Sequence, residues 1–166
     1  MLSSKDLGEN SGAAALFGEV PALWSPSAAS WTWLAPIRTR PLRIYEGFKT
    51  DFTPEGDHTP YLIRKTLGSS EGATKFAELL KQFGESSGLF STVIAHSFAE
   101  DPSAPFEVMV ELHGRPLNIR NVGYGVSQVL PVVVEMITRP RGHSFAIQQP
   151  EVHLHPRAQA ALAGVY

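Results

Sequence analysis

The stretch GYGVSQVLPVVVEMIT, residues 123–138, constrains the fold more than any other part of the sequence. It has the length of a helix, and from Val129 to Ile137 apolar residues occupy almost every side of that helix. A helix that is apolar all round is stable only when other elements bury it. The sequence therefore predicts a buried helix, with Ser127 as its N-cap and Pro131 in its first turn, where a missing N–H is tolerated.

A short apolar run follows this helix. Residues 143–149, HSFAIQQ, are apolar over the length of a strand and end in two amides. Such a continuous run is typical of a parallel strand that is buried on both faces. A proline turn then leads into a second helix from Pro156. Helix, buried strand and helix in succession predict an α/β fold.

The sequence before residue 121 predicts a smaller mixed α+β unit. A strand-like aromatic run precedes two helical segments, one from Pro60 and one from Glu71 with Gly84 as its C-terminal cap. STVIAHSF is expected to form a strand, and the alternation in FEVMVEL indicates another strand with one buried face, which a His-Gly turn joins to RPLNIRN. We divide the chain into a poorly ordered segment, a mixed subdomain and a core segment: residues 1–30, 31–120 and 121–166.

Composition excludes several classes of protein. The 166 residues are 43% hydrophobic, enough for one domain with a core, and the net charge of −2 provides no general basic field for nucleic acid. Without cysteine there are no disulfides or thiolate metal sites. No apolar run approaches the ~18 residues of a membrane span, and the first residues lack a signal-peptide pattern, so we expect a cytoplasmic protein without a membrane partner.

The turn before the central helix has the chemistry of an anion site. Gly123 and Gly125 precede Ser127, so backbone N–H groups lie at the positive end of the helix dipole, an arrangement suited to phosphate. The segment after the apolar strand is the second candidate, because the carboxyl ends of strands in parallel sheets carry ligand-binding side chains. The two candidates are 21 residues apart in sequence, from Ser127 to Gln148.

These segments resemble a known family. NVGYGVSQVLPVVVE, followed after a gap by FAIQQPEVHLHPRAQAALA, is similar to the C-terminal half of ABC-type AAA ATPases, the P-loop ATPases related to recombination-repair and overcoming-lysogenization-defect proteins. WLAPIRTRPLRIYE and PEGDHTPYLIRKTL are similar to the middle region of that family. The resemblance covers residues 31–164 and is most specific over 121–160. It implies part of an ABC-ATPase head that binds and hydrolyses ATP with Mg²⁺ at a head-to-tail dimer interface.

The resemblance also implies roles for individual residues. Gln148 stands at the Mg²⁺-side acid of the Walker B strand, and Gln149 at the catalytic glutamate. The residues implied to contact the ATP held by the other subunit, as a signature motif, are Gly123, Gly125, Ser127 and Gln128. The D-loop-like segment, which crosses the dimer interface in the family, contains His153 and His155.

Two departures from the family pattern bear on activity. No G-x-x-x-x-G-K-[ST] occurs in the sequence, and GSSEGATK lacks both the glycine before its lysine and a preceding strand. Gln148 is neutral, so it supplies no charge against Mg²⁺ and cannot act as a base. We expect no complete nucleotide site within these residues, and a carboxylate at position 148 to be half-buried and unpaired.

Other interpretations of the same residues remain open. Ser127 could be only an N-cap, and His153 with His155 and Glu151 could suggest a metal site, although their spacing in a turn is poor for one ion. Glu151 could also replace the missing acid. Three arginines after the aromatic run could contact phosphates, but such residues more often form a solvated face or local ion pairs: Arg38, Arg40 and Arg43.

The favoured function is that of an ABC-type ATPase part in DNA repair or anti-phage defence, supplying signature and degenerate Walker B elements. Its implied partners are a complete ATPase subunit or a second copy, with a nuclease effector and DNA as further partners. The alternative is a non-catalytic split subunit or a truncated fragment that acts as an interaction module.

Overall fold

The computed structural model describes residues 31–49, 51–70 and 72–165. The predicted poorly ordered segment 1–30 therefore lies outside the described residues. The elements occur in the following order along the chain: β1 (Trp31–Leu34), α1 (Thr59–Leu67), α2 (Ala73–Ser87), β2 (Thr92–Ser97), β3 (Phe106–Leu112), β4 (Arg115–Asn118), the 3-10 helix η2 (Ile119–Asn121), α3 (Tyr124–Thr138), β5 (Ser144–Ile147) and α4 (Pro156–Ala163).

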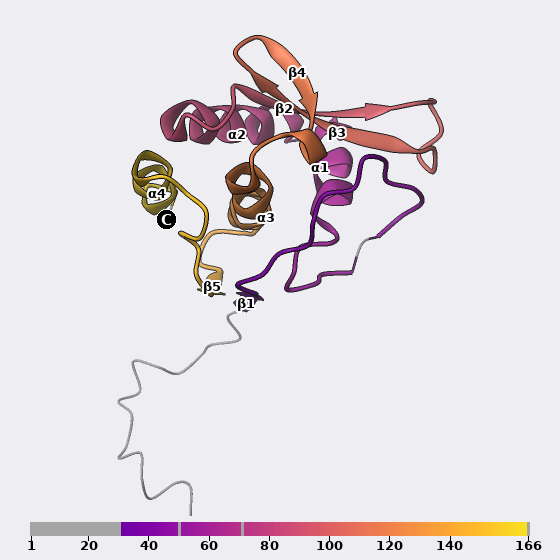
Figure 1. The fold of residues 1–166 in the computed structure, drawn as a ribbon. Helices are drawn as coiled ribbons and strands as arrows, with labels where there is room; N and C mark the ends of the chain where they lie inside the picture. Colours follow the sequence, from indigo (N-terminus) through magenta and orange to yellow (C-terminus); the bar gives the residue numbers. More distant parts are fainter. Residues whose placement is uncertain (1–30, 50, 71, 166) are drawn as a thin grey trace, which may run out of the picture.

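The helix α3 lies at the centre of the molecule. In Figure 1 it has the three-stranded sheet and α1 and α2 on one side, and the strands β1 and β5 on the other. Ten consecutive residues, Val126 to Glu135, are buried, which confirms the predicted central helix. Its start was predicted wrongly, because the N-cap is Gly123 rather than Ser127. Pro131 therefore lies inside the helix rather than in its first turn, and it packs against the loop at Gly56, where a Cβ would come within 2.7 Å of the proline ring.

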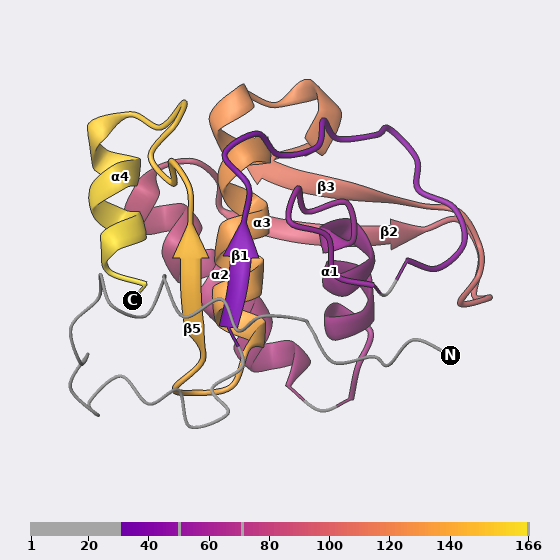
Figure 2. The same cartoon turned by 90° about the horizontal axis from the view of Figure 1, so that it is seen from below.

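The strands β1 and β5 form a parallel pair that lies over α3 and runs along the helix (Figure 2). Thr32 and Leu34 are buried, whereas Trp31 and Trp33 on the opposite face are 68% and 39% exposed. The strand predicted from HSFAIQQ is confirmed as β5. The prediction that this strand is buried on both faces is wrong for the described structure. Although β1 lies within the 31–120 segment, it pairs with β5 of the 121–166 segment.

The second sheet is antiparallel, with the order β2-β3-β4. The alternation predicted for FEVMVEL is confirmed, since Phe106, Val108 and Val110 are fully buried. His113 and Gly114 both have positive φ, as a tight turn between β3 and β4 requires. In Figure 1 the helices α1 and α2 run beneath this sheet.

Both predicted helices before β2 are present, with different ends. α1 begins at Thr59, one residue before the predicted start at Pro60, and its N-cap is His58; Pro60 lies in the first turn. α2 continues past Gly84 to Ser87 and is capped by Gly88, whose φ is 72°. Gly84 is instead an interior position over which the Phe90 ring packs so closely that any Cβ would clash. None of the described helices is long and apolar enough to cross a membrane.

Candidate functional site

The signature-like turn, residues 123–128, packs directly against the β5–α4 loop, residues 148–155. A Cβ on Gly125 would lie 2.7 Å from the backbone oxygen of His153, so only glycine permits this approach. The rings of Tyr124 and His153 meet edge to face with centroids 4.8 Å apart. Gly123, by contrast, is exposed and a Cβ there would have nothing within 4 Å. The β5–α4 loop therefore packs against the start of α3 at Gly125, whereas the N-cap at Gly123 is open to solvent.

Ser127 is turned toward its own helix. The side chain belongs to a residue that is only 5% exposed, and its hydroxyl donates to the backbone oxygen of Tyr124 at 2.9 Å. It also lines a cavity of about 210 Å³ together with Thr39, Gly56 and Pro131. Because the hydroxyl hydrogen is used within the helix, the groups at the helix start that can face an incoming anion are backbone N–H groups.

Gln128 clamps the backbone of Arg38. Its Oε1 accepts from the Arg38 N–H at 3.2 Å, and its Nε2 donates to the Arg38 carbonyl at 3.3 Å. The Arg38 guanidinium, in a residue that is 1% exposed, donates through Nη2 to the backbone oxygen of Gln148 at 3.1 Å. One arginine thus connects the signature-like turn to the end of β5. The interpretation of Arg38 as a solvated residue is wrong, whereas Arg40 and Arg43 are exposed.

The two amides lie just beyond β5. The Gln148 N–H donates to the Leu34 carbonyl at 3.1 Å, which extends the ladder between β1 and β5 by one bond. The side chains of Gln148, Gln149 and Glu151 are exposed, and Gln149 has a φ of 46°. Backbone bonds from Val152 to Gln149 and from Leu154 to Glu151 fold this segment into tight turns. The exposed position of Gln148 differs from the predicted half-buried one.

The two histidines of the β5–α4 loop have different roles. His153, with a φ of 64°, contacts Tyr124, while His155 is the N-cap of α4 and accepts the Ala158 N–H through Nδ1 at 3.2 Å. Within the part of the chain that the structure describes, no three His, Asp or Glu side chains gather where they could hold a metal ion. The geometry gives no support to a metal site at His153 and His155.

Comparison with known families now supplies the classification. A family model described as "AAA domain, putative AbiEii toxin, Type IV TA system" matches residues 20–166. The chain belongs to this AAA-domain family. Comparison with curated proteins and with solved structures gives no match. The family and the arrangement of parallel and antiparallel sheets together give an α/β, P-loop-like fold with a nucleotide-binding, ATPase-like function.

The described residues of this AAA domain fit the phosphate group of a Mg-nucleotide better than they fit its metal ion. The open start of α3, with glycine at its N-cap and no acidic residue in its first turn, suits a phosphate group. The end of β5 suits Mg²⁺ poorly, because the cation prefers carboxylates and Gln148 and Gln149 offer only amides. These two positions therefore offer no charged oxygen donor to a metal ion.

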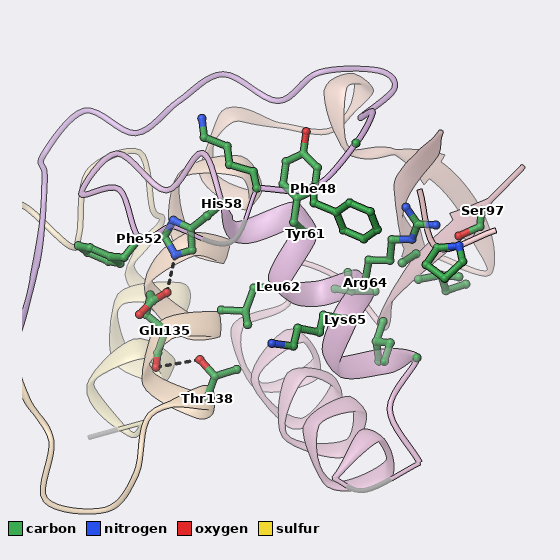
Figure 3. Close-up of a pocket in the computed structure, with 18 of the residues that line it drawn as sticks. Phe48, Phe52, His58, Tyr61, Leu62, Arg64, Lys65, Ser97, Glu135 and Thr138 are labelled. Carbon is green, nitrogen blue, oxygen red and sulfur yellow. Dashed lines mark hydrogen bonds and ion pairs between the residues drawn. The ribbon is translucent and has the colours of Figure 1, made fainter. Parts of the chain in front are cut away.

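A second polar cluster of the AAA domain lies near the opposite end of α3 (Figure 3). His58 Nε2 is 2.6 Å from Glu135 Oε1, and Arg139 donates to Glu135 Oε2 at 2.7 and 2.8 Å. Since the Thr53 N–H donates to His58 Nδ1, that nitrogen carries no proton and Nε2 donates to the carboxylate. Burial alone would raise the pKa of Glu135, but the bonds from His58 and Arg139 outweigh it and hold the pKa below the ordinary value. No sequence pattern indicated this cluster.

Proposed function

We propose that this AAA domain forms the signature side of a composite ATP site in an ABC-type ATPase, and that the phosphate cradle of the site lies on other residues. The observation that carries the proposal is the packing of the signature-like turn on the β5–α4 loop, at Gly125 and His153. Backbone groups at an open helix start can hold a γ-phosphate presented from outside. The β5–α4 loop lies beside these backbone groups and would contact the subunit that presents the phosphate.

The parallel pair β1–β5 offers a place for the rest of the ATPase core. Parallel sheets occur almost only with both faces covered, yet the face with Trp31 and Trp33 is exposed among the described residues. We therefore propose that further β-strand and helix units of the ATPase core, one of which carries a G-x-x-x-x-G-K-[ST] turn, extend this two-stranded sheet at its edges and cover its exposed face. They would come from a complete ATPase subunit or from a part of the same protein outside these 166 residues.

The neutral Gln148 and Gln149 favour a structural or regulatory use of the nucleotide. A Mg²⁺ ion in the complete site would take its protein carboxylate from elsewhere, and it would neutralise phosphate charge there. We propose that the chain contributes to nucleotide-dependent association rather than to a base-catalysed step of its own. An interaction module without hydrolysis is the second candidate, and the two amides are the observation that favours it.

The biological setting follows by analogy alone. The description of the matched family names a toxin of a type IV toxin–antitoxin system. We propose a defence or DNA-repair role in which the ATPase controls an effector such as a nuclease, with DNA as a further partner. A cytoplasmic location is part of this proposal.

Gly123 provides the test, because a side chain there points into open space. The chain is mixed with an AAA domain that has an intact G-x-x-x-x-G-K-[ST] turn and a disabled signature turn, with and without Mg-ATP. The wild-type chain and Gly123→Ala are expected to form an ATP-dependent complex on size-exclusion chromatography. Gly123→Glu is expected to keep its melting temperature but lose the complex, since its carboxylate repels phosphate at the helix start. Association that is equal with and without ATP, or unaffected by Gly123→Glu, contradicts the proposal.

A further inference from the structure

The cavity of about 210 Å³ that Ser127 lines lies between the start of α1, the first half of α3 and the loop at residues 39–42. Its walls are mostly apolar, and the apolar side chains that line it are Leu42, Ile63, Val108, Ile119, Leu130 and Pro131. An apolar cavity of about 150 Å³ is large enough to hold benzene. This cavity therefore has room for a ligand somewhat larger than benzene.

The cavity wall carries a buried hydroxyl group that lacks a hydrogen bond. Thr59 is 3% exposed, and its Oγ1 has no partner among the residues that the structure describes. Gly56 also lines the cavity, and a Cβ built on it would lie 3.2 Å from this oxygen. A buried hydroxyl without a partner lowers the free energy of unfolding. A ligand atom that bonds to Thr59 Oγ1 would remove this penalty.

Two other hydroxyl-bearing residues line the cavity and retain hydrogen-bonding capacity. The Tyr45 hydroxyl accepts the Leu42 N–H at 3.0 Å, and no described group accepts its own hydrogen. Burial raises the pKa of Tyr45 to about 12, so the phenol keeps this hydrogen at neutral pH. Ser127 Oγ donates to the Tyr124 carbonyl and can still accept a bond. Hydroxyl groups of this kind can bond a neutral hydroxyl or carbonyl group.

The charged residues of the lining favour an uncharged ligand. They are Arg40, Lys49 and Asp57, and none of them is buried. Lys49 Nζ pairs with Asp57 Oδ2 at 2.7 Å, and Arg40 is exposed to solvent at the loop. An ionised ligand would lose its hydration in the cavity without meeting a buried counter-charge, which is unfavourable.

We propose that this cavity binds a small, uncharged, mostly apolar ligand through one hydroxyl or carbonyl group that bonds to Thr59 Oγ1. The apolar part of the ligand would rest on Ile63, Ile119 and Leu130. Because the ligand would contact both α1 and α3, its binding would stabilise the folded chain. The inference does not depend on the nucleotide site.

The test uses phenol and toluene, which have nearly the same shape and differ in the hydroxyl group, with benzoate as a charged probe. Titration of the full chain with millimolar phenol is expected to give saturable NMR shifts and to raise the melting temperature. The shifts are expected at the Thr59 amide and at the methyl groups of Ile63, Ile119 and Leu130. Benzoate is expected to bind more weakly than phenol.

Thr59→Val tests the hydrogen bond, because valine keeps the branched shape and removes a hydroxyl that has no partner in the described structure. The melting temperature of this variant is expected to be no lower than that of the wild type. The ratio of phenol affinity to toluene affinity is expected to fall about threefold to tenfold, the effect of one neutral hydrogen bond. Thr59→Ser keeps the hydroxyl group, so this ratio should stay within about twofold of the wild-type value.

Three results overturn the proposal. The first is the absence of saturable phenol binding to the folded chain, which would leave a cavity that holds only water. The second is benzoate binding as tight as that of phenol, or shifts that arise away from the cavity. The third is a phenol-to-toluene ratio that Thr59→Val leaves unchanged. The shifts in the wild-type chain test the site even where a variant does not fold.

Discussion

Gly125 and Gly123 stand two residues apart at the start of α3 and have different steric surroundings. Gly125→Ala places a Cβ against the His153 carbonyl, so the turn and the β5–α4 loop must separate. We expect a loss of roughly 1–3 kcal/mol in unfolding free energy, the usual range for overpacking. Urea denaturation measures this loss.

Gly123→Ala is the matched control for this prediction. It adds the same methyl group where nothing lies within 4 Å and where φ is −58°, which any residue adopts. Its free energy of unfolding should stay within about 0.5 kcal/mol of the wild type. Equal effects of the two substitutions would show that backbone entropy, rather than contact with His153, determines the cost.

At the residue scale the sequence indicated which segments are candidates for a site better than what each side chain contacts. The turn at Gly123–Gln128 and the amides at Gln148 and Gln149 were singled out from their place beside a helix and a strand, and their part in a nucleotide site stays a prediction. The burial of Arg38 could not be found, because its neighbours Arg40 and Arg43 are exposed and its partners, the Gln128 side-chain amide and the Gln148 carbonyl, are 90 and 110 residues away. A contact at such a distance leaves no local pattern.

At the scale of elements, the cluster of His58, Glu135 and Arg139 joins the loop before α1 to the end of α3. Glu135 is fully buried, so Glu135→Gln removes the charge that Arg139 pairs with and leaves an amide N–H facing a donor. We expect a loss of roughly 1.5–3 kcal/mol at pH 7, typical of hydrogen bonds to charged groups. Thermal or urea unfolding at neutral pH measures it.

The same cluster predicts a dependence of stability on pH. The pKa of Glu135 is held below its ordinary value of 4.5, so the stabilisation is present above that value and is lost as pH falls through the folded-state pKa. The difference in unfolding free energy between wild type and Glu135→Gln should therefore shrink below about pH 4.5. A difference that stays constant down to the acid limit would show that Glu135 does not titrate in this way.

Periodicity identified the elements, but the residues that were predicted to cap the helices gave the wrong ends. Gly84 resembles a helix cap in sequence, yet the Phe90 ring packs over it and α2 continues to Gly88. Ser127 resembles an N-cap, yet α3 starts at Tyr124, and Gly125 in its first turn packs against the His153 carbonyl. In both cases a tertiary contact, which a local pattern does not contain, determines where the helix begins or ends.

At the scale of the whole molecule, the missing phosphate cradle determines whether the chain can hydrolyse ATP by itself. A chain without G-x-x-x-x-G-K-[ST] has no backbone nest and lysine to hold the phosphates of Mg-ATP. The purified chain should therefore not release phosphate from ATP. Turnover that persists through further purification and scales with the amount of chain would contradict this.

Substitution at Gln148 should have different consequences in the isolated chain and in a complete assembly. In the isolated chain Gln148→Glu places a carboxylate at an exposed position, near the Arg38 guanidinium that binds the Gln148 carbonyl. The expected half-buried, unpaired charge does not arise there, so the melting temperature should change by no more than about 2 °C.

In an assembly that includes the cradle, the proposed Walker B position would direct the same carboxylate toward Mg²⁺, which prefers charged oxygen donors to an amide. We expect Mg-ATP to bind roughly tenfold more tightly, with no gain when Mg²⁺ is absent, as for other changes to the ligands around a metal. Gln149→Glu is the matched control, since it adds the same charge at the next residue, where φ is 46° and the side chain leaves the backbone in another direction. Nucleotide titrations with and without Mg²⁺ measure both variants. An unchanged Mg-ATP affinity for Gln148→Glu, or an equal gain for the two variants, would show that Gln148 does not occupy the position of the Walker B acid.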